Sequence, residues 1–318
     1  MKDKSYILWL LILLLMIILI VLILINSVPL LVQKIPEENG SINIYFCPRQ
    51  NCSFYFMQAL ANSNFAECAL YDINLPEVIN VLQNKNIDLL VDEDNYYGYG
   101  KKIVGYGIMH NKFCVFDTGI ITGSFNPTFN DNYKNNNNLL IINSEILRQN
   151  YLDEFKELKE GINVKTRKTK VIVNGVLFEN YFCPEDNCQA HVLMILNGAQ
   201  HEIKFMIFSF TDDDIGDLLV RKFNQGILVT GIMEKTQQND YDEYEKLFSN
   251  GINVSWDKNP GKVHHKVFII DGKIVITGSY NPTKNGNENN DENIVIIHDE
   301  RIARLYLEEF DYVVNNYS

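Results

Sequence analysis

The sequence predicts an α/β protein with two sheet-and-helix lobes related by pseudo-twofold symmetry, preceded by an N-terminal transmembrane helix. Three observations lead to this prediction. Several blocks of residues recur in the same order in both halves of the chain, β-branched and aromatic runs alternate with amphipathic stretches, and an apolar segment stands near the N-terminus. The expected boundaries are an anchor at residues 1–34, a first repeat at 35–164 and a second repeat at 165–318.

The apolar segment covers residues 6–25 and contains no charged side chain. A helix of this length, rising about 1.5 Å per residue, matches a hydrocarbon core roughly 30 Å thick. A cleaved signal peptide is the alternative, but its apolar region is usually about 7–15 residues long, and no A-x-A pattern follows Ile25. We therefore expect a membrane anchor that is not cleaved.

The charges on either side of this segment predict its orientation. Lys2 and Lys4 precede it, whereas Lys34, Glu37 and Glu38 follow it. The positive-inside rule then places the N-terminus in the cytoplasm. The expected location is the cell membrane, crossed once, with the body of the chain on the extracytoplasmic side.

The chain of 318 residues carries a net charge of −12. This balance argues against a protein that holds nucleic acid over a broad basic surface. A local basic groove is compatible with it, because the charge near a site is what steers a substrate.

The sequence contains six cysteines, an even number that fits an oxidising compartment. Cys47 with Cys52, and Cys183 with Cys188, each enclose four residues after a strand-like run. A local disulfide in each pair is the first interpretation. A four-cysteine zinc site is the second, because the spacing lies at the edge of the usual range, and free buried thiols are the third. Cys114 is expected to serve core packing.

The internal repeat is carried by four blocks that occur twice in the same order. The second copy has extra residues between its first two blocks, which we interpret as a helix at 240–248 followed by a short strand. The first copy is expected to lack this unit. Residues 45–52 return as 181–188, 110–112 as 264–266, 122–128 as 277–283, and 151–155 as 306–310.

Within the second copy, the residue pattern predicts strand, helix, strand, hairpin, strand and helix in that order. The first helix begins at an aspartate-rich turn that suits a helix N-terminus, and Asp271, Gly272 and Lys273 form the hairpin turn. Near-continuous apolar strands indicate a sheet covered on both faces. The expected strands are 203–210, 227–233, 267–270, 274–277 and 293–297, and the expected helices are 211–226 and 301–314.

The residues repeated with the highest fidelity are polar, and each copy has one imidazole, one ammonium, one hydroxyl and one amide. Two imidazoles within a ring of hydrogen-bond donors suit a phosphate. One histidine would attack phosphorus and form a phospho-histidine, while the other protonates the leaving oxygen and then activates water. The lysines and asparagines would stabilise the non-bridging oxygens, so that no metal or other cofactor is required. The residues are His110, Lys112, Ser124 and Asn126, and in the second copy His264, Lys266, Ser279 and Asn281.

These residues belong to two HxKxxxxD motifs, which end at Asp117 and Asp271 and are each followed by Gly-Ser-x-Asn. The doubled pattern resembles the signature of the phospholipase D superfamily, from about residue 41 to the C-terminus. The compact size and the order of elements are similar to the small nuclease and cardiolipin-hydrolase branch. The resemblance implies phospholipase D-like lobes that share one metal-independent site, with His110 as nucleophile and His264 as acid and base. The residues themselves leave the order of these roles open.

Members of the superfamily also place a carboxylate after Gly-Ser-x-Asn, where it orients the catalytic imidazole. By this resemblance Glu292 has that role in the second copy, whereas the aligned residue of the first copy is Asn137. An amide supports an imidazolium less than a carboxylate does, so the first copy is expected to be the weaker half. Asp117 and Asp271 are counted with the catalytic residues, although an aspartate at a strand end also caps a turn. His265 is expected to point away from the site, because adjacent strand residues face opposite sides.

The superfamily includes phospholipases D, cardiolipin synthases and hydrolases, and nucleases, and the motif does not choose among them. The anchor and the acidic balance favour membrane phospholipid as the substrate. The sequence therefore predicts a phosphodiesterase that hydrolyses phospholipid in the manner of phospholipase D. A membrane-tethered endonuclease acting on single-stranded DNA or RNA is the alternative, because lysines surround the second motif. A headgroup transferase and an inactive phospholipid-binding scaffold also stay open.

Overall fold

The chain divides into two units, Met1–Ile35 and Pro36–Ser318. Residues 9–19 of the first unit are helical. Across the described ranges, no helix is both long and apolar enough to cross a membrane. The transmembrane helix expected at 6–25 extends into residues that lie outside those ranges. The computed structural model describes residues 6, 9–19, 34–85, 87–105 and 107–317.

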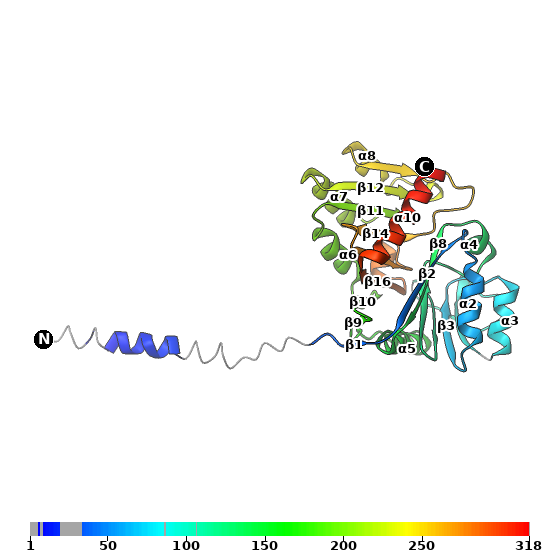
Figure 1. The fold of residues 1–318 in the computed structure, drawn as a ribbon, viewed down its shortest axis with the longest axis horizontal. Helices are drawn as coiled ribbons and strands as arrows, with labels where there is room; N and C mark the ends of the chain where they lie inside the picture. The colour runs from blue at the N-terminus through cyan, green and yellow to red at the C-terminus, as the bar shows by residue number, and fades with distance from the viewer. Residues whose placement is uncertain (1–5, 7–8, 20–33, 86, 106, 318) are drawn as a thin grey trace. The chain divides into compact units, whose positions relative to one another are not determined.

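In the described part of the second unit, the strands form two sheets (Figure 1). The sheet of the first copy has the strand order β2-β8-β7-β6-β3-β4-β5. Its β3, β4 and β5 are parallel to one another, whereas β6, β7 and β8 continue the sheet as antiparallel neighbours. The strands are β2 (Ser41–Cys47), β3 (Ala66–Leu70), β4 (Asp88–Asp92), β5 (Lys101–Ile103), β6 (Lys112–Phe116), β7 (Gly119–Gly123) and β8 (Asn137–Asn143).

The second sheet repeats this arrangement and adds two strands at one edge, in the order β1-β9-β10-β16-β15-β14-β11-β12-β13. The added β1 comes from the start of the unit and pairs in parallel with β9. The strands are β1 (Glu37–Glu38), β9 (Lys170–Val173), β10 (Val176–Cys183), β11 (Glu202–Ile207), β12 (Leu228–Met233), β13 (Asn253–Trp256), β14 (Lys266–Ile270), β15 (Ile274–Gly278) and β16 (Glu292–His298).

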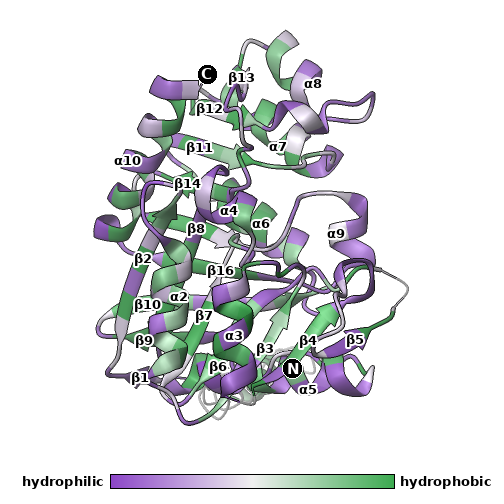
Figure 2. Ribbon diagram, turned by 90° about the vertical axis from the view of Figure 1, so that its right-hand side faces the viewer, coloured by the Kyte–Doolittle hydropathy of each residue, from purple (hydrophilic) through white to green (hydrophobic). Residues whose placement is uncertain are grey.

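Helices cover both faces of each sheet, as the near-continuous apolar strands predicted. The largest buried cluster joins the two long helices α5 and α10 to strands of both sheets, and further clusters lie beneath α2 with α3 and beneath α6 with α7. Strands such as β4 and β7 are coloured hydrophobic and α9 hydrophilic (Figure 2). The helices are α2 (Cys52–Ala61), α3 (Pro76–Asn84), α4 (Phe129–Tyr133), α5 (Glu145–Glu160), α6 (Cys188–Asn197), α7 (Asp213–Asn224), α8 (Tyr244–Ser249), α9 (Lys284–Glu288) and α10 (Glu300–Tyr317).

The extra unit of the second copy is present as α8 and β13, but α8 begins later than the sequence predicted. Asn239 and Asp242 hydrogen-bond nearby backbone N–H groups, and such local bonds favour a turn over a helix. The first copy lacks the helix but not the strand. Its β5 pairs in parallel with β4, just as β13 pairs with β12.

Each long helix carries an aromatic side chain into the opposite lobe. Tyr151 of α5 meets Phe182 of β10 with ring centroids 4.9 Å apart. Tyr306 of α10 meets Phe46 of β2 at 5.1 Å. These are aligned positions of the repeat, so the contacts are reciprocal and the interface has the expected pseudo-twofold symmetry.

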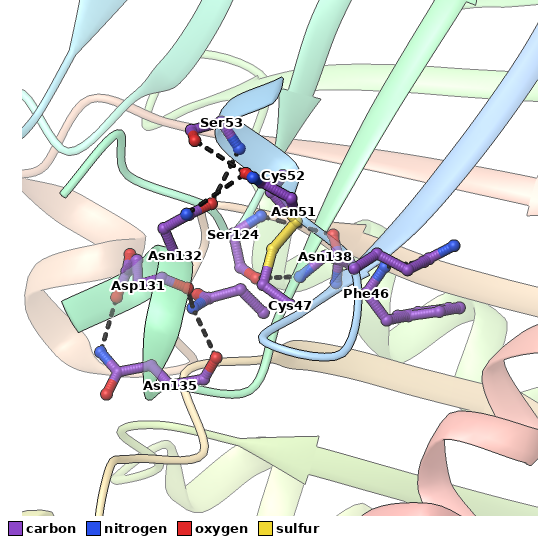
Figure 3. The surroundings of a disulfide bond; sticks show 12 residues. Phe46, Cys47, Asn51, Cys52, Ser53, Ser124, Asp131, Asn132, Asn135 and Asn138 are labelled. Carbon is purple, nitrogen blue, oxygen red and sulfur yellow. Dashed lines mark hydrogen bonds between the residues drawn. A yellow bond between two sulfur atoms is a disulfide. The ribbon is translucent and has the colours of Figure 1, made fainter. Parts of the chain in front are cut away.

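All six cysteines are paired. The two local disulfides, Cys47–Cys52 (Figure 3) and Cys183–Cys188, are present, so the zinc interpretation is wrong. The third joins Cys68 to Cys114, which lie directly opposite each other on β3 and β6 with Cα atoms 4.0 Å apart. The packing role expected for Cys114 is therefore replaced by a covalent bond, which follows from a strand pairing that the sequence pattern did not predict.

We expect removal of the Cys68–Cys114 bond to destabilise the protein more than removal of a local one. A crosslink restricts the unfolded chain more when it closes a longer loop, and 46 residues separate this pair against 5 for the local pairs. The Cys68→Ala/Cys114→Ala variant should lose about 2–4 kcal/mol of unfolding free energy in urea titrations followed by circular dichroism. Cys183→Ala/Cys188→Ala is the matched control, and an equal or larger loss there would contradict this account.

Candidate active site

Each HxK segment reaches the site at the start of an inner strand. Lys112 is the first residue of β6 and Lys266 the first of β14, and each histidine stands two residues earlier. An isolated β-bridge joins the residue before each histidine to the other lobe, next to the start of that lobe's last strand. The backbone of each lobe thus sets the position of the other lobe's histidine. The bridges pair Met109 with Asp291 and Val263 with Asn136.

The His110 imidazole is held by Glu292, a residue of the second copy. His110 Nδ1 lies 2.8 Å from both carboxylate oxygens, and the Ser279 hydroxyl donates to the same carboxylate at 2.6 Å. Burial raises the pKa of Glu292 to about 8 and lowers the pKa of His110 well below its usual value. With Nδ1 engaged, Nε2 is the ring nitrogen of a neutral imidazole that is left to meet a substrate.

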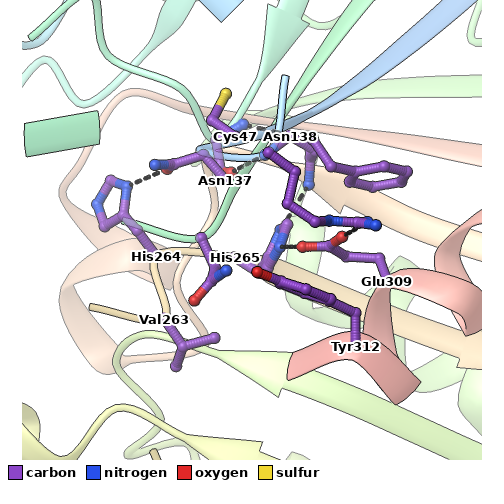
Figure 4. A network of polar contacts seen from close by, with 12 residues as sticks. Cys47, Asn137, Asn138, Val263, His264, His265, Glu309 and Tyr312 are labelled. Atoms are coloured by element: carbon purple, nitrogen blue, oxygen red, sulfur yellow. Dashed lines mark hydrogen bonds and ion pairs between the residues drawn. The ribbon is translucent and has the colours of Figure 1, made fainter. Parts of the chain in front are cut away.

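His264 has the reciprocal arrangement with an amide in place of the carboxylate. Its Nδ1 lies 2.8 Å from Asn137 Oδ1 of the first copy (Figure 4). From the sequence we expected Asn137 to weaken the first copy, but the structure places it at the histidine of the second. Because the lobes exchange their orienting residues across the interface, Asn137 supports the histidine of the second copy, whereas His110 keeps a carboxylate partner.

An aromatic ring stands against each histidine. Tyr71 meets His110 edge to face, with ring centroids 4.7 Å apart, and Phe208 meets His264 at 4.8 Å. Neither residue was predicted from the sequence. The sequence pattern could have predicted them, because each is an aromatic residue directly after one of two aligned strands, β3 and β11.

The two motif lysines are buried below the histidines. Lys112 Nζ donates to the His110 carbonyl at 2.7 Å, and Lys266 Nζ donates to the His264 carbonyl at 2.8 Å. Burial lowers the pKa of Lys112 to about 8 and lowers the pKa of Lys266 well below its usual value. Each ammonium is also within 5 Å of the aromatic ring beside its histidine, so both charges are held where a phosphate would neutralise them.

A cavity of about 600 Å³ contains both imidazoles in its lining. The two Gly-Ser-x-Asn amides also line it, so the structure brings four of the eight residues predicted for the phosphate site to one surface, the two histidines and the two asparagines. Charges of both signs surround them. The lining includes His110, His264, Asn126, Asn281, Tyr71, Phe208, Asp72, Asp131, Lys262 and Lys284.

The structure does not bring the two motif serines to this lining. Ser124 Oγ accepts from the Asn138 N–H and Ser279 Oγ from the Asn293 N–H, each at 3.0 Å. Both serines are fully buried. They were expected to bind phosphate, but here they fix the start of β8 and β16, and Ser279 additionally holds the Glu292 carboxylate.

The motif aspartates lie at the far end of β6 and β14, a full strand away from the lysines. Asp117 accepts from the backbone N–H groups of Asn64 and Phe65. Asp271 accepts from three consecutive N–H groups, those of residues 200–202. Five residues of strand at about 3.3 Å each separate the ends, so neither carboxylate reaches the cavity. Their contacts are those of turn caps rather than of catalytic groups.

His265 points away from the cavity, as the strand alternation predicted. It is fully buried between the lobes, with Nδ1 3.2 Å from Asn138 and Nε2 3.2 Å from Glu309 (Figure 4). The aligned residue Asn111 makes the reciprocal contacts, to Asn293 at 2.7 Å and to Glu154 at 3.0 Å. These buried polar pairs fix how the lobes dock beneath the site.

The two related lobes, with one HxK segment each and a shared cavity, define a phospholipase D-like protein. The family model described as cardiolipin synthase, PLD-like domain, matches residues 58–159 and 192–314, and the chain belongs to this family of the phospholipase D superfamily.

Curated relatives match part of the chain. The mitochondrial cardiolipin hydrolase of Chlamydomonas reinhardtii is 29% identical over 141 residues, which cover 41% of this chain and 62% of the relative. The phospholipase D of Rickettsia conorii is 31% identical over 130 residues, which cover 41% of this chain and 65% of the relative. The chain therefore spans less than two thirds of the length of either relative.

Among solved structures, the phosphatidylserine synthase of Haemophilus influenzae is similar in fold, with a TM-score of 0.67 at 12% sequence identity. The likeness covers 86% of this chain and 87% of that chain.

We expect Asp271→Ala to reduce stability and to leave turnover by the folded protein unchanged. The substitution removes the acceptor for three backbone N–H groups, and Asp271 also has a positive φ of 52° that alanine tolerates poorly. The loss should be about 1–2 kcal/mol in thermal or urea unfolding. Asp271→Asn, which keeps an oxygen and tolerates this backbone, is the matched control. A fall in kcat with unchanged stability would restore a catalytic role.

Proposed function

We propose that the protein is a phosphodiesterase that hydrolyses membrane phospholipid in the manner of phospholipase D, through a phospho-histidine intermediate. The observation that carries the proposal is the reciprocal support of the two imidazoles, His110 by Glu292 and His264 by Asn137, in the lining of one cavity. The two buried motif lysines lie behind that lining, each bonded to the carbonyl of its histidine. This arrangement provides two imidazoles that differ in environment and a positive field for a phosphate, and it requires no metal for either step.

In the proposed first step, His110 Nε2 attacks phosphorus and the bond from phosphorus to the headgroup oxygen breaks. His264 donates a proton to that oxygen as it leaves. The positive charge that His110 gains when it is phosphorylated favours the ionised form of Glu292, whose pKa burial otherwise raises. The carboxylate then accepts the Nδ1–H and offsets that charge. Lys112 and Lys266, with the two cavity amides, stabilise the charge on the non-bridging oxygens.

In the second step, His264 takes a proton from water, the water oxygen attacks phosphorus, and the phosphorus–nitrogen bond to His110 breaks. The products are phosphatidic acid and the regenerated enzyme. The resemblance to the phospholipase D superfamily supports this order of roles, whereas burial lowers the pKa of both imidazoles alike.

Several observations favour a lipid. The relatives described above are named for cardiolipin hydrolysis and phospholipase D, the chain is acidic, and Asp72 and Asp131 in the cavity lining disfavour a long polyanion. A single-stranded nucleic acid is the alternative substrate, and Lys262 and Lys284 in the same lining favour it.

We also propose that the apolar segment at 6–25 anchors the protein in the cell membrane, with the unit beginning at Pro36 on the extracytoplasmic side. The length and charge pattern of the segment support this proposal. The pairing of all six cysteines in disulfides supports an oxidising location. An anchor would hold the site within reach of lipid headgroups.

We expect the full-length chain in detergent to release phosphatidic acid from mixed micelles of phosphatidylcholine and cardiolipin in the presence of EDTA. His110→Ala and His264→Ala should each reduce the rate by at least about 10³-fold, because each removes a group that reacts or transfers a proton. His201→Ala, which changes an exposed histidine, is the matched control.

Labelled single-stranded DNA and RNA are assayed in parallel. Cleavage of nucleic acid alone would select the alternative substrate, and loss of all activity in EDTA would contradict the metal-free mechanism. Full activity in His110→Ala would contradict the shared two-histidine site.

We expect kcat/KM to fall as the pH rises above about 8. Burial lowers the pKa of Lys112 to about 8, so this lysine carries its charge below that pH and loses it above, and the phosphate loses a positive partner. A phosphodiester stays ionised throughout, so the substrate does not contribute to the change. Lys112→Arg should extend the plateau to higher pH, and an unchanged profile in this variant would argue against Lys112 as the titrating group.

A further inference from the structure

The two copies of the repeat differ in where they carry a carboxylate behind the histidines. After Gly-Ser-x-Asn the second copy has Glu292 where the first has Asn137. Six residues earlier the difference is reversed, because the first copy has Asp131 where the second has Gly286. Each copy therefore supplies one carboxylate to this region, from a different position.

Asp131 points at His264, the histidine that has the Asn137 amide where His110 has the Glu292 carboxylate. Its Oδ2 lies 3.3 Å from His264 Nδ1, beside the Asn137 oxygen at 2.8 Å. The side chain is buried, with 3% exposure. Its orientation is fixed, because Oδ2 accepts from the N–H and the side-chain amide of Asn126 at 2.8 and 2.9 Å. Its Oδ1 accepts from the Asn135 amide at 2.6 Å (Figure 3).

The second copy has no room for a side chain at the aligned position. A Cβ atom on Gly286 would lie 2.3 Å from the backbone oxygen of Asn281. With this backbone, a carboxylate side chain cannot be accommodated at position 286 of the second copy. His110 has Glu292 as its partner instead. The two copies use alternative positions for the same kind of group.

We propose that Asp131 is the positioning carboxylate of His264 and gives the second imidazole the anionic partner that Glu292 gives the first. This inference rests on the proposed two-histidine function and deepens it. Asp131 acts through His264: it holds the proton on Nδ1 together with Asn137, and it stabilises the imidazolium that delivers a proton to the leaving oxygen.

The other charges around His264 make this partner necessary. Lys266 lies on the same strand, Lys112 faces the site from β6, and Lys262 lines the cavity. Burial and Lys266 lower the pKa of His264 to about 3, while Asp131 opposes them. Burial acts against the charge of Asp131, but His264 and the hydrogen bonds hold the pKa of this carboxyl well below its usual value. On the opposite wall, His110, Tyr71 and Asp72 also line the cavity, and Glu292 lies behind His110.

The test uses the full-length protein in detergent and two phosphodiesters with different leaving groups. The choline of phosphatidylcholine would leave as an alkoxide and needs a proton donor, whereas one nitrophenyl group of bis(p-nitrophenyl) phosphate leaves as a stabilised phenolate and needs almost none. Asp131→Asn should lower kcat on phosphatidylcholine by about 10²-fold and leave turnover of the nitrophenyl ester nearly unchanged. Asp72→Asn, which removes another carboxylate of the same lining, should change both substrates by the same factor.

A second variant restores the carboxylate at the position used by the other copy. Asn137→Glu in the Asp131→Asn background should recover most of the lost activity, whereas Asn137→Glu alone should be impaired because two carboxylates then face one imidazole. Equal losses on both substrates, or no recovery in a double variant that folds as the parent does, would overturn the inference and leave Asp131 as a support for the Asn126 loop.

One measurement is independent of turnover. NMR titration of the His264 imidazole nitrogens should give a lower pKa in Asp131→Asn than in the parent protein, since a negative charge that favours the imidazolium has been removed. An unchanged titration would overturn the inference even in an active enzyme. If the parent protein hydrolyses neither ester, the proposed function fails, and this titration still decides whether Asp131 supports His264.

Discussion

Each imidazole of the site is held by the lobe that does not carry it. His110 meets Glu292 and His264 meets Asn137, each at 2.8 Å, and a short backbone bridge precedes each contact. One lobe alone would expose a histidine whose Nδ1 lacks its partner. The chemistry of the site therefore depends on docking of the two lobes, which is why the interface is built from reciprocal aromatic and polar contacts rather than from apolar packing alone.

Burial of several ionisable side chains is the main cost of this arrangement in folding free energy. Lys112, Lys266 and Glu292 are nearly inaccessible to water, and charges in such surroundings are costly unless they are paired. Burial lowers the pKa of Lys112 and raises the pKa of Glu292, so each shift favours the neutral form. A bound phosphate would change this balance, because its negative charge compensates the lysines. The free site thus holds an unfavourable electrostatic arrangement that an anionic substrate relieves.

The repeat is symmetric in its fold and asymmetric in its charges. Seven strands recur in the same order in both lobes, and so does the bridge before each histidine, yet Asp131 aligns with Gly286 and Asn137 with Glu292. A symmetric pair of imidazoles would have no reason to divide two roles between them. Different anionic partners in different hydrogen-bond networks provide that reason, because a nucleophile works as a neutral ring and a proton donor works as a charged one.

The sequence alone determined the duplication, the α/β character of both lobes and the identity of the two histidines, lysines and asparagines, because these depend on local pattern and on residues repeated at matching spacings. Only the tertiary structure decided which groups meet. Glu292 is 182 residues from its partner His110, and Cys68 is 46 residues from Cys114. Asp117 and Asp271 belong to the motif in sequence but lie a strand length from the cavity. Such pairings are set by strand register and lobe docking, and neither leaves a periodic signal in the chain.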